Sequence, residues 1–125
     1  MKQANAETLT IAQIESVKGL EAVRDIAAID GIDALLVGPM DLSVSLGCPG
    51  DLANQRLQEA IGIIADAAEK SGKILGMHAG EALLEAWIPR GLRLVMNSLD
   101  TNMLKSGMTS VSSWYRNARA VHPES

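Results

Sequence analysis

Four short apolar runs, each followed by a segment with helical spacing, constrain the fold of this chain more than any other sequence feature. The runs predicted to form strands are residues 9–15, 32–38, 73–79 and 92–98. The segments predicted to form helices are residues 18–29, 41–47, 51–72, 80–91 and 100–121. This βαβαβαβα order predicts parallel strands joined by right-handed crossover helices, and therefore an α/β fold.

Residues with strong preferences at helix ends set the predicted boundaries. Asp41, Asp51 and Asp100 are predicted N-caps, because a short acceptor side chain satisfies free backbone N–H groups at that position. Pro89 is predicted to break the helix at its position, and Gly72 is predicted to end the long helix before it. No linker separates these elements, so one domain is predicted.

Two architectures agree with this order of elements. One is a small, open, doubly wound sheet with helices on both faces. The other is part of a (β/α)8 barrel, whose usual length of about 250 residues exceeds the 125 residues here. Four units cannot close a barrel, and they would leave two edge strands and an uncovered apolar interior. Gln13 and Glu15 share one strand face, which suits either a barrel mouth or the crevice of an open sheet.

Composition excludes several classes of function. The net charge is −4 and no cluster of Lys or Arg occurs, which argues against nucleic acid and anionic membranes as partners. Cys48 is the only cysteine, so no internal disulfide can form and a reducing cytosol is expected. No apolar run approaches the roughly 18 residues that a membrane-spanning helix needs. A cytoplasmic protein is therefore predicted.

Two motifs, found in order along the chain, carry a specific resemblance. A Q-x-E strand, "AQIES", precedes "GIDALLVGPMDLSVSLG", which contains the pattern G-P-x-D-L-S-x-x-x-G. Together with the later "AAEKSGKILGM" and "LVMNSLDTNMLKSG", they make the chain resemble the HpcH/HpaI aldolase family, metal-dependent pyruvate aldolases that cleave 4-hydroxy-2-oxo acids. The resemblance implies a (β/α)8 TIM-barrel type of fold. Residues 1–125 are then expected to be a single C-terminal half-barrel that holds strands five to eight.

The same resemblance implies which parts of the family's active site this chain lacks. The family carries a catalytic His and a substrate-binding Arg on its early strands, and no residue here matches them by position. His78 and His122 lie elsewhere in the pattern and do not substitute for that His. No catalytic residue is therefore expected in this chain, because the base and the Arg belong to the N-terminal half of the family's barrel.

Glu15 and Asp41 are the candidate metal ligands. Each follows a predicted strand, and acids at the carboxyl ends of neighbouring parallel strands can converge on one cation. Two carboxylates without a Cys or His nearby favour a hard ion, Mg²⁺ or Mn²⁺, completed by water and substrate oxygens. The resemblance implies that the ion binds pyruvate and acts as a Lewis acid. The alternative is that Glu15 is a strand-end acid and Asp41 only a helix cap.

The "GPMD" loop is the candidate site for the substrate carboxylate. Gly38 permits close approach of a ligand to the backbone, and Pro39 fixes the turn without offering an N–H. The N–H groups of Met40 and Asp41 would then open a short helix, which favours an anion. The resemblance implies that this loop binds the pyruvate carboxylate. An ordinary turn between a strand and a helix is the alternative.

Two further side chains are candidates for substrate contact. Gln13 is expected beside Glu15, either bonded to the substrate or buried and satisfied by neighbouring backbone. His78 ends the third predicted strand, either lining the mouth near the aldehyde part of the substrate or serving as a structural His. The absence of a partner motif favours the structural role for His78. Trp114 and Tyr115 on the last helix are expected to make an oligomer contact, as the family resemblance implies.

The predicted function is metal-dependent retro-aldol cleavage of a 4-hydroxy-2-oxo acid to pyruvate and an aldehyde, incomplete or inactive in this chain alone. Two alternatives remain. One is a fragment of a citryl- or malyl-CoA-type lyase, which would need basic residues for CoA that cannot be assigned here. The other is a non-enzymatic remnant or oligomerisation module. Exposed half-barrel edges are expected to make the chain a homo-oligomer.

Overall fold

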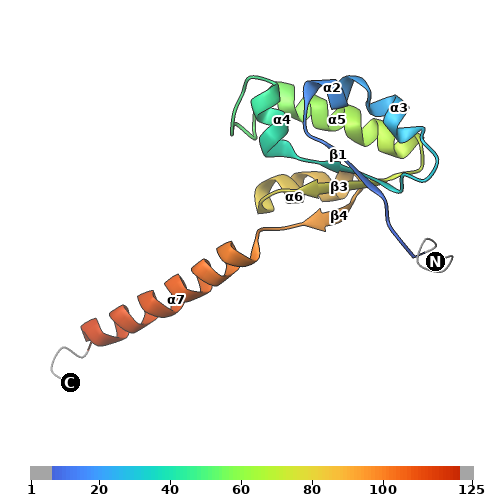
Figure 1. Cartoon of the computed structure of the whole chain (residues 1–125). Helices are drawn as coiled ribbons and strands as arrows, with labels where there is room; N and C mark the ends of the chain where they lie inside the picture. Colours follow the sequence, from blue (N-terminus) through green and yellow to red (C-terminus); the bar gives the residue numbers. More distant parts are fainter. Residues whose placement is uncertain (1–6, 122–125) are drawn as a thin grey trace.

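A parallel four-stranded sheet forms the centre of the chain in the computed structural model, which describes residues 7–121 (Figure 1). Its strands are β1 (Ile11–Ile14), β2 (Ala34–Val37), β3 (Ile74–His78) and β4 (Leu92–Met96). Each strand lies within one of the four apolar runs predicted from the sequence. The predicted α/β class is therefore confirmed.

The strands lie side by side in the order β1-β2-β3-β4, and every neighbouring pair is parallel. A doubly wound sheet reverses its strand order at a switch point, whereas a barrel adds each strand next to the one before it. Consecutive order with right-handed crossovers also places the connecting helices on one face of the sheet. Within the described residues the order is thus of the barrel type. The assignment to strands five to eight stays a prediction.

Helices connect and follow the strands. They are α2 (Val17–Glu21), α3 (Val23–Ala27), α4 (Pro39–Ser45), α5 (Gln55–Lys70), α6 (Glu81–Trp87), the 3₁₀ turn η1 (Ile88–Arg90) and α7 (Asp100–Val121). The predicted break at Pro89 is confirmed, because α6 ends two residues before it and the chain continues as η1. Gly72 follows α5 with a φ of 65°, the left-handed conformation expected of a residue that ends a helix.

The core lies between the sheet and α5. The buried residues of α5 recur at helical spacing, and they are Leu57, Ala60, Ile61, Ile64, Ala67 and Ala68. They join one cluster with fully buried strand residues such as Leu35, Val37 and Met77. This packing holds α5 against β2 and β3, and it positions the carboxyl ends of those strands.

Two predicted N-caps are wrong. The cap of α5 is Asn54, whose side chain accepts a hydrogen bond from the backbone N–H of Arg56 at 3.1 Å, and Asp51 instead lies three residues earlier. Asp41 lies inside the first turn of α4, which begins at Pro39. Proline suits the first position of a helix because the N–H it lacks would have no partner there. The helix therefore starts two residues earlier than the aspartate indicated.

Two other helical segments also differ from the prediction. Residues 18–29 form two short helices instead of one, because the chain leaves helical geometry at Ala22. The last helix begins at Asp100 itself, and the Asp100 side chain accepts from the adjacent N–H of Thr101 at 2.7 Å. Asp100 is therefore a first-turn residue, one position away from the predicted cap.

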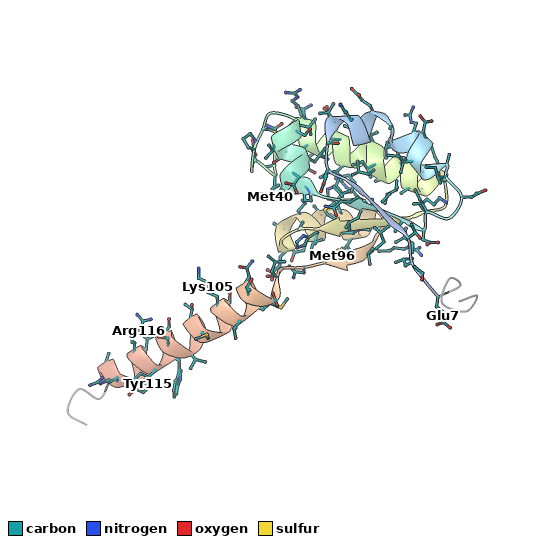
Figure 2. All side chains as sticks on the ribbon, viewed as in Figure 1. Glu7, Met40, Met96, Lys105, Tyr115 and Arg116 are labelled. Atoms are coloured by element: carbon teal, nitrogen blue, oxygen red, sulfur yellow. The ribbon has the colours of Figure 1, made fainter. Side chains whose placement is uncertain are left out.

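Helix α7 extends away from the sheet (Figure 1). The side chains of its residues 100–120 are exposed. Figure 2 shows Lys105, Tyr115 and Arg116 distributed along this helix, away from the strands. The helix is continuous through Gly107, although several weak helix formers occur in its middle. Among the described residues, neither α7 nor any shorter helix has the length and apolar character to cross a membrane. His122 lies outside the described residues.

Candidate functional site

The carboxyl ends of the four strands surround a pocket of about 360 Å³. The residues that line it are Gln13, Gly38, Pro39, Met40, Asp41, Leu52, His78, Ala79, Gly80, Asn97, Ser98, Leu99 and Asn102. All six residues predicted to contact substrate are among them. Parallel strands bring these side chains together because their carboxyl ends meet at one edge of the sheet.

A larger cavity of about 720 Å³ lies at the opposite ends of β3 and β4, between α5 and η1. None of the residues predicted from the sequence to bind metal or substrate lines it. The smaller pocket at the carboxyl ends is therefore the candidate site.

The close approach of Gly38 to two side chains joins the Q-x-E strand to the GPMD loop. A Cβ atom built on Gly38 would lie 3.1 Å from Gln13 Nε2 and 3.1 Å from Glu15 Cβ. The backbone φ of Gly38 is −101°, an ordinary value for any residue. A glycine is therefore needed here to make room for the Gln13 and Glu15 side chains, and not to permit an unusual backbone conformation.

Gln13 and Glu15 also contact each other. Gln13 Nε2 donates a hydrogen bond to Glu15 Oε2 at 2.5 Å, and both residues are exposed. The alternative of a buried Gln13 satisfied by backbone is therefore wrong. The bond engages one oxygen of the Glu15 carboxylate and leaves the lone pairs of the other for a further partner.

The GPMD loop opens α4, with Gly38 as the N-cap and Pro39 as the first helical residue. The N–H groups of Met40 and Asp41 precede the first intrahelical bond, which Leu42 N–H makes to the carbonyl of Gly38 at 2.9 Å. Asp41 is exposed in this first turn, where a carboxylate is favoured by the partial positive charge of the helix start. The loop therefore presents two backbone donors and one carboxylate at the pocket.

A buried serine holds α4 in place behind the loop. Ser43 Oγ donates to the Met40 carbonyl at 2.6 Å and accepts from Gly50 N–H at 2.9 Å. Ser43 is fully buried. These bonds connect the first turn of α4 to Gly50 in the segment that follows the helix, so they hold the GPMD loop in place. The sequence signal was the S of the G-P-x-D-L-S pattern, to which no role had been assigned.

His78 is the last residue of β3 and is half-buried. The strand register places it on the same sheet face as Gln13, and both line the pocket. Within residues 7–121, its ring nitrogens have no hydrogen-bond partner in the protein. The ring is therefore available to a molecule in the pocket.

Three polar residues of the pocket were not identified from the sequence. Asn97 and Ser98 follow β4 directly, and Asn102 lies in the first turn of α7. Ser98 has a φ of 63°, which is a left-handed conformation that residues other than glycine adopt only at an energetic cost. The available signal for Asn97 and Ser98 was their position at the carboxyl end of the fourth predicted strand, the same kind of position that identified Glu15 on the first.

The donor set decides which metal ion suits this site. In the described part of the chain, no three side chains of His, Cys, Asp or Glu gather at one point. Glu15 and Asp41 follow the neighbouring strands β1 and β2, so these two carboxylates are the candidate ligands among the described residues. Mg²⁺ suits such a set, because it is commonly bound through one or two carboxylates with water and substrate oxygens completing six ligands. A structural zinc site, with four protein ligands, does not fit.

Comparison with known proteins confirms the family that the motifs indicated. Residues 1–106 match the family model described as HpcH/HpaI aldolase/citrate lyase. A hydroxypyruvate/pyruvate aldolase of Delftia acidovorans is 31% identical over 122 residues, which cover 97% of this chain and 45% of that protein. One of Paraburkholderia phytofirmans is 47% identical over 79 residues, 63% of this chain and 30% of that protein.

Solved structures of the same family have a similar fold. The crystal structure of an HpcH/HpaI aldolase/citrate lyase family protein from Burkholderia cenocepacia superposes with a TM-score of 0.85 at 34% identity. The match covers 92% of this chain and 45% of that one. The chain thus spans less than half the length of the relatives described here.

Proposed function

The chain belongs to the HpcH/HpaI aldolase/citrate lyase family, and on that premise we propose that it supplies the metal- and pyruvate-binding part of a carbon–carbon lyase. Its four strands would be strands five to eight of an eight-stranded barrel. The observation that carries the proposal is the packing of Gly38 against Gln13 and Glu15, which joins the two motifs. Gln13 and Gly38 line the pocket, whereas Glu15 is not among its lining residues.

The proposed reaction is retro-aldol cleavage of a 4-hydroxy-2-oxo acid. The substrate loses the proton of its 4-hydroxyl group, the C3–C4 bond breaks, and the electron pair moves through C3 towards the 2-keto oxygen. An aldehyde leaves, and C3 then takes a proton to give pyruvate. A divalent ion held by Glu15 and Asp41 would supply positive charge beside the keto oxygen, where negative charge develops.

The residues of this chain have separate roles in that scheme. Gln13 orients the Glu15 carboxylate through its amide hydrogen bond. The backbone N–H groups of Met40 and Asp41 donate to the substrate carboxylate. His78 contacts the aldehyde part of the substrate from β3. None of these groups is positioned here as the base for the 4-hydroxyl proton, and loss of general acid–base catalysis costs on the order of 10²–10⁴ in rate.

Binding of Mn²⁺ to the full chain tests the proposal without requiring activity. Electron paramagnetic resonance reports free Mn²⁺, and oxalate serves as a stand-in for the pyruvate enolate. Glu15→Gln and Asp41→Asn are each expected to weaken Mn²⁺ binding by about tenfold or more. Glu69→Gln, an exposed carboxylate on α5, is the matched control and should bind like the parent chain. Equal Mn²⁺ uptake by all four proteins would refute the metal assignment.

The alternative of a CoA-dependent lyase receives less support. CoA carries several phosphate groups, which proteins recognise with Lys and Arg side chains. The residues that line the pocket include no Lys or Arg. A non-enzymatic role predicts a different outcome of the Mn²⁺ experiment, namely no site that Glu15→Gln removes.

A further inference from the structure

The larger cavity of the chain, of about 720 Å³, lies at the amino ends of β3 and β4, away from the candidate site. Its lining comes from residues between 62 and 75 and between 87 and 93, and we call it the basal cavity. One wall is α5 and the other is η1 with the start of β4. Its volume lies in the range of about 300–1,000 Å³ that is typical of small-molecule sites.

Three positively charged side chains line the basal cavity. Lys73 directly precedes β3, Arg90 ends η1 and Arg93 lies in β4. The sequence keeps Lys73 apart from the two arginines, so no run of basic residues indicates this group. The fold brings the three cations to one cavity because the amino ends of neighbouring parallel strands lie side by side.

Two carboxylates on the opposite wall only partly offset these cations. Asp66 and Glu69 of α5 line the basal cavity. Asp66 already forms an ion pair with Lys70, with Oδ2 and Nζ 2.7 Å apart. The cationic side chains of the lining therefore outnumber its carboxylates, although the whole chain has a net charge of −4. The basal cavity favours an anion.

Arg90 is held in place before any ligand binds. Its guanidinium carbon lies 5.0 Å from the centre of the Trp87 ring. Trp87 is buried, and its indole N–H donates a hydrogen bond to Gln58 Oε1 at 3.3 Å. Stacking on a fixed ring orients the planar guanidinium and leaves the N–H groups at its edge free to donate. Within residues 7–121, this guanidinium has no hydrogen bond or ion pair to the protein.

Arg93 reaches the basal cavity because β4 carries an extra residue. The register passes from Leu75 opposite Leu92 to Gly76 opposite Leu94, so Arg93 has no counterpart in β3. Such a bulge commonly changes the direction of a side chain, and bulges recur beside functional sites. The Arg93 guanidinium also has no hydrogen bond or ion pair to other described residues. Two arginines therefore offer unused donors to the same cavity.

We propose that the basal cavity binds the phosphate group of a small phosphate monoester, at a site separate from the proposed lyase site. Arg90 and Arg93 donate to the phosphate oxygens, because the guanidinium fork matches their geometry. Lys73 spends one of its three donors on the Ile29 carbonyl at 3.3 Å and keeps two. The organic part of the ligand lies along Gly62 of α5, where no side chain occupies the wall. This proposal does not rest on the lyase function.

Trp87 fluorescence tests the site in the full chain, because Arg90 lies against its ring. Trp114→Phe leaves Trp87 as the only tryptophan. Inorganic phosphate is titrated above about pH 7, where it is mostly a dianion, with chloride holding the ionic strength constant. The emission should change saturably. Arg93→Gln should weaken phosphate binding about tenfold or more, because charge-assisted hydrogen bonds are lost. Arg24→Gln, an exposed arginine of α3 outside the cavity, is the matched control and should bind like the parent chain.

Thermal unfolding gives a second measurement that does not use the Trp87 signal. A ligand that binds only the folded chain raises its melting temperature. Phosphate should raise the melting temperature of the parent chain and of Arg24→Gln, and should leave those of Arg90→Gln and Arg93→Gln nearly unchanged. Circular dichroism without phosphate checks that both variants are folded. The absence of a saturable response in the parent chain, or equal responses of all four proteins, would overturn the proposal.

Two further ligands decide which anion the basal cavity accepts. Glycerol phosphate should bind more tightly than inorganic phosphate, because its glycerol part adds contacts along α5. Malonate should bind more weakly than phosphate, because its two carboxylates do not present three oxygens around one centre. Malonate binding as tight as that of phosphate overturns the assignment to phosphate, and a preference for the inorganic ion overturns the assignment to an ester. The Mn²⁺ experiment reads a different site, so either proposal can fail alone.

Discussion

Gly38→Ala adds one methyl group at the point where β1 and the GPMD loop meet. The new Cβ would lie 3.1 Å from Gln13 Nε2, 3.1 Å from Glu15 Cβ and 3.3 Å from Glu15 Oε2. Ordinary carbon contacts lie at about 3.5–4.0 Å, so each neighbour must move by a few tenths of an ångström. The backbone itself is not strained, because φ is −101°.

The size of the effect follows from which atoms must move. Overpacking in a rigid core costs about 1–3 kcal/mol. Gln13 and Glu15 are exposed side chains, so the loss of stability should lie near 1 kcal/mol. Movement of Glu15 should also displace one of the two proposed metal ligands. We expect Mn²⁺ affinity to fall by about tenfold, which corresponds to about 1.4 kcal/mol.

Urea unfolding followed by circular dichroism measures the stability, and electron paramagnetic resonance measures Mn²⁺ binding. Gly62→Ala in α5 is the matched control, because its Cβ would meet only Trp87 at 3.9 Å. Alanine in a helix interior should raise stability by about 0.5–1 kcal/mol and leave Mn²⁺ binding unchanged. The reasoning is refuted if Gly38→Ala binds Mn²⁺ as the parent chain does, because close packing would then have no part in positioning Glu15.

Two other substitutions test the supports of the site and the sheet. Ser43→Ala removes the hydrogen-bond partner of the Met40 carbonyl and of the Gly50 N–H. The free energy of unfolding, measured in urea, should therefore fall by about 1–3 kcal/mol. A change below about 0.5 kcal/mol would mean that these bonds do not stabilise α4. Gly76→Ala would place a Cβ 2.9 Å from Leu36 Cδ1, so thermal unfolding should show a loss of about 1–3 kcal/mol. An unchanged melting temperature for Gly76→Ala would indicate that the leucines move aside freely.

The secondary structure was predictable where local sequence sets it. The four strands are short, mostly apolar runs, and the buried face of α5 repeats at helical spacing, so neighbours along the chain suffice to identify them. The caps were less predictable, because several residues near a helix start compete for the same role. Asn54 displaced Asp51 as the cap of α5, and Pro39 began α4 before Asp41.

The candidate site was predictable in its components and not in its contacts. Residues two apart share a strand face, so Gln13 and Glu15 were expected together, and their hydrogen bond agrees with that. The glycine of the GPMD loop was expected to admit a ligand. Its observed neighbours are the side chains of Gln13 in β1 and of Glu15 directly after β1, more than 20 residues earlier in the chain.

The sequence by itself determined the elements, the family and the identity of the metal and substrate candidates. Only the tertiary structure decided that β4 lies beside β3, which brings Asn97 and Ser98 to the pocket with His78. It also decided that one apolar sheet face has no cover among the described residues. The physical reason is the range of the interactions. Periodicity and capping act over a few residues, whereas strand pairing and burial join segments that the sequence keeps far apart.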